Sequence, residues 1–111
     1  MKKVLEIHQE GYNCAESIVK SVNEEKGLNI PVEVASPFGG GMSVGGTCGA
    51  VTGSLMAFGA AKGRDSRKLS RELISKVKEK YGTIQCIELK KKGISCDEII
   101  EYCYDILEKG I

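Results

Sequence analysis

The segment that decides the fold runs from Ser36 to Gly63 and reads SPFGGGMSVGGTCGAVTGSLMAFGAAKG. It contains no charged residue before Lys62. Its first half is rich in glycine, which is typical of a loop, whereas its second half is small and apolar. A helix that is apolar around most of its circumference belongs in the middle of a bundle. We therefore expect a glycine-rich loop that leads into a central buried helix.

Local signals predict the two ends of this helix. Thr47 has the hydroxyl of a good N-cap, which places Cys48 at the first helical position. Gly63 suits the left-handed conformation that closes many helices, so we expect the helix to end near Ala61. Small residues share one face of it at Gly49, Gly53, Ala57 and Ala60. Because glycine costs about 1 kcal/mol relative to alanine inside a helix, this face predicts a second backbone packed very close.

Two other functions for the segment are disfavoured by its composition. A phosphate-binding loop would end in Gly-Lys-Ser or Gly-Lys-Thr, and no such ending is present. A membrane span needs about 20 predominantly apolar residues, but half of this stretch is mostly glycine, serine and proline. The sequence therefore predicts no membrane insertion.

The whole chain has the length and charge of one globular domain, which we assign to residues 1–111. Its formal net charge of +1 argues against a nucleic-acid surface. Residues 1–8 lack the apolar core of a secretory signal, so we expect a cytoplasmic protein.

Helical patterns account for most of the remaining chain. We expect a short helix over 2–9, one from Cys14 to about Gly27, one from Asp65 or Ser66 to Tyr81, and a last helix from Cys96. A connector with one helical turn should link Leu28 to Pro37, and Thr83 should open a short turn at Cys86. The predicted fold is all-α, a compact bundle of four to five helices around the glycine-rich loop and the central helix.

The five cysteines are numerous for a chain expected in a reducing compartment. Three of them directly follow a residue with N-cap chemistry, in the pairs Asn13–Cys14, Thr47–Cys48 and Ser95–Cys96, and Cys86 lies within a turn of Thr83. Helix N-termini stabilise thiolates and lower the thiol pKa from about 8.5, so these four positions predict reactive or metal-ligating cysteines. Cys103 falls in the middle of a helix and is expected to be a core residue. The lone His8 is expected to be structural.

Three classes of function fit this pattern. The first is thiol–disulfide redox chemistry at Cys48 with Cys14, Cys86 or Cys96, although no Cys-x-x-Cys motif is present. The second is an iron–sulfur cluster or metal ion held by the same four cysteines, although they are 34, 38 and 10 positions apart rather than in close pairs. The third is a structural helical module whose small-residue helix packs in a homodimer. No Cys-His catalytic arrangement is evident, so a cysteine hydrolase is disfavoured.

The motif Cys48-Gly49-Ala50-Val51-Thr52-Gly53 resembles the centre of the C-GCAxxG-C-C family of putative redox-active proteins. The resemblance extends to the stretch from Gly11 to Ala15 and to the glycines before Met42. It implies that the characteristic cysteines of the family are Cys14, Cys48, Cys86 and Cys96, with Cys103 as an alternative to Cys96. It also implies a redox function with an unidentified partner, and a link to transporters because relatives often lie near transporter genes.

Overall fold

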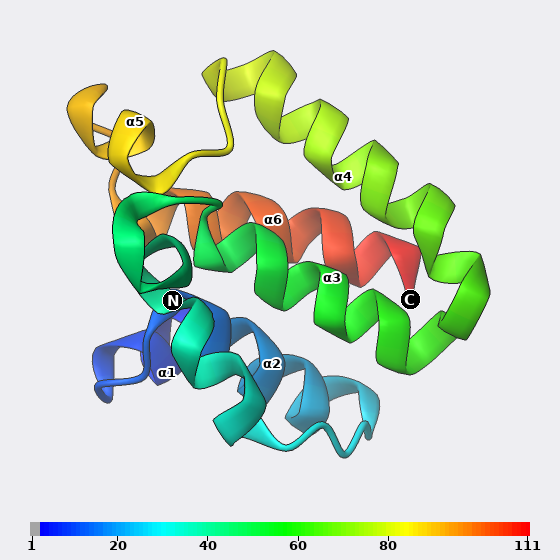
Figure 1. The fold of residues 1–111 in the computed structure, drawn as a ribbon. Coiled ribbons are helices and arrows are strands. Elements are labelled where there is room, and N and C mark those ends of the chain that lie inside the picture. The colour runs from blue at the N-terminus through cyan, green and yellow to red at the C-terminus, as the bar shows by residue number, and fades with distance from the viewer. Residues whose placement is uncertain (1–2) are drawn as a thin grey trace.

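The computed structural model describes residues 3–111, which form six α-helices and no β-strand (Figure 1). The all-α fold predicted from the sequence is confirmed. The sixth helix arises at Cys86, where we expected only a short turn. Lys2, the expected start of the first helix, lies outside the described residues. The helices are α1 (Lys3–Gln9), α2 (Cys14–Lys26), α3 (Gly49–Lys62), α4 (Ser66–Tyr81), α5 (Cys86–Lys91) and α6 (Cys96–Gly110).

Helix α3 occupies the centre of the molecule, as its apolar composition predicts. It packs against α2, α4 and α6, and Figure 1 shows these helices arranged around it. Val51 and Phe58 of α3 are fully or almost fully buried, and the core continues into the inner faces of the surrounding helices. The other large side chains of this core include Ile18, Val22, Leu73, Val77, Ile100, Tyr104 and Leu107.

The small-residue face of α3 packs against α2 of the same chain. A methyl group built onto Gly53 would lie 2.9 Å from the carbonyl oxygen and 3.1 Å from the Cα atom of Ala15. A methyl group on Gly49 would overlap with the sulfur of Cys14 and would lie 2.9 Å from the carbonyl oxygen of Phe38. The glycines therefore permit the close backbone approach that we expected. Because α2 covers them, these two glycines are not available to a second copy of the chain.

Caps fix the ends of the helices that surround the site. Asn13 and Glu16 form a complete capping box at the start of α2, and Gly27 closes that helix in the left-handed conformation. The Ser95 hydroxyl accepts a hydrogen bond from the Glu98 N–H at 3.1 Å at the start of α6. These boundaries agree with the predictions from the sequence.

The connection between α2 and α3 is longer than a simple turn. It contains a 3₁₀ segment, η1 (Val32–Phe38), and a coiled glycine segment, η2 (Gly41–Gly45). The η1 segment packs against α2 through the buried Ala35. The η2 segment contacts α5, so the glycine loop joins two parts of the chain that are far apart in sequence.

Among the helices of the described part of the chain, none combines the length and the apolar character that crossing a bilayer requires.

Candidate functional site

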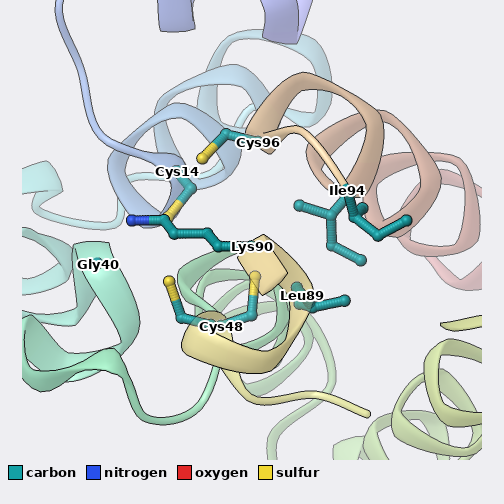
Figure 2. Close-up of a pocket in the computed structure, with 9 residues that line it drawn as sticks. Cys14, Gly40, Cys48, Leu89, Lys90, Ile94 and Cys96 are labelled. Carbon is teal, nitrogen blue, oxygen red and sulfur yellow. The ribbon is translucent and has the colours of Figure 1, made fainter. Parts of the chain in front are cut away.

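Four cysteines from four separate parts of the chain line one cavity. They are Cys14, Cys48, Cys86 and Cys96, here called the four-cysteine cluster. The cavity is small, with about 40 Å³ of space that water can occupy, and Figure 2 shows Cys14, Cys48 and Cys96 around it. All five cysteines of the chain are free thiols in this structure. The remaining walls consist of Gly40, Leu89, Lys90, Ile94 and Ile99.

Cys14 is positioned by the capping box at the start of α2. The Asn13 side chain accepts a hydrogen bond from the Glu16 N–H at 2.9 Å, and the Glu16 carboxylate accepts one from the Asn13 N–H at 2.9 Å. Cys14 is consequently the first residue of the helix, as the sequence predicts. Its sulfur lies against Gly49, where there is no side chain to displace it.

Cys48 and Cys86 are held together by a two-residue antiparallel bridge between Thr47 and Gln85. The Cys48 N–H donates to the Ile84 carbonyl at 2.7 Å, and the Cys86 N–H donates to the Gly46 carbonyl at 2.6 Å. Each cysteine directly follows its bridge residue and stands at the start of a helix. The bridge therefore brings the beginnings of α3 and α5 to one place.

This bridge also explains why one sequence prediction was wrong. Thr47 was expected to cap the central helix, but its backbone is extended in the bridge, and α3 begins one residue later at Gly49. Cys48 is itself the N-cap residue, with its carbonyl accepting from the N–H groups of Val51 and Thr52 at 3.0 and 3.1 Å. A tertiary contact thus replaced the local capping preference.

The glycine loop covers Cys86. A methyl group on Gly41 would collide with the Cys86 Cβ atom at 2.6 Å, so this position requires glycine. The loop is closed by a hydrogen bond from the Gly46 N–H to the Gly41 carbonyl at 2.7 Å. Met42 and Ser43 in the same loop have φ angles of 58° and 65°, which non-glycine residues adopt only at a cost in energy.

Burial controls the acidity of the thiols in the cluster. Cys48 is 5 % exposed, and this burial raises its pKa to about 12, although the N–H groups of Ala50 and Val51 act in the opposite direction. Cys96 is exposed as a residue, but its thiol is partly desolvated at the cavity, and this raises its pKa, with the thiol of Cys14 as the next cause. Our expectation that the helix start would lower the pKa of Cys48 is therefore wrong, because desolvation of the thiolate outweighs the hydrogen bonds.

Cys103 differs from the cluster in its position. It is fully buried in the middle of α6, as predicted, and it does not line the cavity. Burial raises its pKa well above the ordinary value. These features are those of a small apolar core residue.

Among residues 3–111, Lys90 is the one charged residue that lines the cavity, and the sequence analysis did not identify it. Figure 2 shows its side chain running across the cavity between Cys96 and Cys48. Lys92, two residues later, has a different role, because its ammonium group donates to the Tyr81 carbonyl at 2.9 Å.

His8 lies outside the site and contributes a structural contact, as expected. Its Nδ1 atom is 2.8 Å from a carboxylate oxygen of Asp97, which ties α1 to the first turn of α6. His8 does not line the cysteine cavity and is not positioned to act as a base there.

The placement of the possible ligand side chains bears on metal binding. Within residues 3–111, no group of three or more histidine, cysteine, aspartate or glutamate side chains is placed so that it could hold one ion. The cluster in this conformation therefore does not fit a metal centre, although the same four cysteines face one cavity.

Comparison with known proteins agrees with the cysteine pattern. No curated protein and no solved structure matches the chain. The family model described as putative redox-active protein (C_GCAxxG_C_C) matches residues 12–110, which include all four cysteines of the cluster. Because this match covers nearly the whole chain, the protein belongs to the C_GCAxxG_C_C family of putative redox-active proteins.

Proposed function

We propose that the protein is a thiol redox protein that forms a reversible disulfide within the four-cysteine cluster, from Cys48 to Cys14, Cys86 or Cys96. The observation that carries this proposal is the convergence of four free thiols from distant parts of the chain on one cavity. Cysteines that served only as core residues would have no reason to gather around a cavity that opens to solvent.

The chemistry requires only two thiols within reach of each other. Disulfide formation removes two electrons and two protons from the pair, and an external disulfide that accepts them becomes two thiols. The bond needs Cα atoms about 4.4–6.8 Å apart. A cytoplasmic location, which the sequence predicts, would keep the resting protein reduced.

A thiol count before and after mild oxidation tests the proposal. Protein purified without oxygen should expose five thiols on unfolding, lose two of them after treatment with the thiol oxidant diamide, and regain them with reductant. The Cys103→Ala variant is a matched control and should go from four thiols to two. Retention of all five thiols in the folded wild-type protein would overturn the proposal.

Metal analysis of the same anaerobic sample tests the alternative that the sequence left open. About one equivalent of iron or zinc, with thiols that become reactive only after a chelator is added, would favour a cluster or metal carrier over a dithiol protein.

A further inference from the structure

The four thiols of the cluster differ in their access to solvent. Cys14, Cys48 and Cys86 are 8 %, 5 % and 8 % exposed, respectively. Cys96, the first residue of α6, is exposed. Cys96 is therefore the member of the cluster that a disulfide in another molecule meets first, whereas the other three residues are buried.

Cys14 lies between Cys96, the exposed member of the four-cysteine cluster, and Cys48, the most buried member of the cluster. Its sulfur packs against Gly49, the residue next to Cys48. In Figure 2 it stands between Cys96 and Cys48. The thiol of Cys14 raises the pKa of Cys48 and the pKa of Cys96. For both thiols this effect of Cys14 is larger than that of Cys86. Both observations identify Cys14 as their common neighbour.

We propose that the cluster is a relay in which Cys96 reacts with an external disulfide, Cys14 resolves the mixed disulfide, and Cys48 carries the bond into the interior. This inference rests on the proposed function and adds to it the order in which the cysteines react. The substrate class that follows is an exposed disulfide, on a small molecule or a protein, that can contact Cys96 at the surface.

Each step of the relay is a balanced exchange of one sulfur for another. The Cys96 thiolate attacks the external disulfide, forms a mixed disulfide and releases one external thiolate. The Cys14 thiolate then attacks the Cys96 sulfur, which forms the Cys14–Cys96 bond and releases the second external thiolate. Finally, Cys48 attacks Cys14 as it gives up its proton, and Cys96 leaves as a thiolate that takes up this proton. The external disulfide gains two electrons, and its two thiolates take up the protons released by the protein thiols.

Lys90 assists the outer end of this relay. Its side chain lines the cavity, and its positive charge lowers the pKa of Cys96, in opposition to the desolvation of that thiol. Cys96 is a thiolate both when it attacks and when it leaves, so a neighbouring positive charge favours both steps. The carboxylate of Asp97, the next residue along the chain, raises the pKa of Cys96, but this effect is smaller than that of Lys90.

The test uses glutathione disulfide as the external disulfide and identifies the products by mass spectrometry after acid quenching. In wild-type protein, glutathione should appear first on Cys96, followed by a Cys14–Cys96 bond and then a Cys14–Cys48 bond. In the Cys14→Ser variant the mixed disulfide on Cys96 should persist, with its resolution slowed at least about tenfold because the oriented neighbour is missing. The matched Cys103→Ala variant, whose missing thiol lies outside the cavity, should resolve it at the wild-type rate.

Several outcomes would overturn the relay. Glutathione found first on Cys14 or Cys86, or equal resolution rates in the Cys14→Ser and wild-type proteins, would refute the proposed order while leaving the dithiol function intact. Absence of any intramolecular disulfide in wild-type protein would refute both. Circular dichroism would show whether the variants are folded, and the order of products in the wild-type protein tests the relay without any substitution.

Discussion

The packing of α3 on α2 makes opposite predictions for two glycines of the same helix. Gly53 faces the backbone of α2, whereas Gly59 is exposed and a methyl group built onto it would meet no atom within 4 Å. Replacing either glycine with alanine removes the conformational cost of glycine in a helix. This change alone would raise the free energy of unfolding by about 1 kcal/mol. The two substitutions differ in what the new methyl group contacts.

At Gly53 the contact is too short to be accepted without movement. The methyl group would lie 2.9 Å from the Ala15 carbonyl oxygen, which is about 0.5 Å inside ordinary contact at 3.4 Å. The obstructing atoms belong to the backbone of α2, so the two helices must separate. Such overpacking costs about 1–3 kcal/mol. We therefore expect Gly53→Ala to lower the free energy of unfolding by about 1 kcal/mol, and Gly59→Ala to raise it by up to about 1 kcal/mol.

Thermal unfolding followed by far-UV circular dichroism would measure this difference. For a chain of this size 1 kcal/mol corresponds to roughly 4 °C, so the two variants should unfold about 8 °C apart, with the wild-type protein between them. If Gly53→Ala stabilised the protein as much as Gly59→Ala, then α2 and α3 would not be in backbone contact at this point, and our account of the small-residue face would be wrong.

Three further predictions concern the site and its supports. Because the pKa of Cys48 is raised to about 12 in the folded protein, the folded state holds a proton that the unfolded state loses above about pH 9. Unfolding free energy should therefore fall as the pH rises from about 9 to 12, and urea titrations should show a smaller fall in Cys48→Ala. Asn13→Ala removes the cap in front of Cys14 and should cost about 1 kcal/mol by the same measurement, whereas an unchanged midpoint would contradict the role of the capping box. Cys103→Ala should lower stability by about 1 kcal/mol through the cavity it leaves, yet oxidise at the wild-type rate in a thiol assay; a change in that rate would place Cys103 in the site.

The capping rules predicted the helix ends that depend only on neighbouring residues in the sequence. Asn13 and Ser95 cap α2 and α6 with their own side chains, and Gly27 and Gly82 end α2 and α4 in the left-handed conformation, so the sequence identified these boundaries. The start of α3 was placed one residue too early, because Thr47 pairs with a residue 38 positions away. No local pattern contains that information.

The same distinction applies to the site. The coincidence of cysteines with helix starts pointed to the four residues that the fold brings to one cavity, because a helix start is a local property. The raised pKa of Cys48 could not be inferred from its position at a helix start. Its main cause is the burial of the thiol, which arises only when the chain folds. Lys90 was missed for a related reason, because a run of lysines is usually solvated and only the placement of α5 directs one of them to the thiols.

Mapping the disulfide of mildly oxidised protein by mass spectrometry tests the central claim most directly. The account predicts one intramolecular bond between two members of the four-cysteine cluster, with Cys103 still a free thiol in the same molecules. A bond that includes Cys103, a bond only between chains, or no bond at all under conditions that oxidise free dithiols would contradict it.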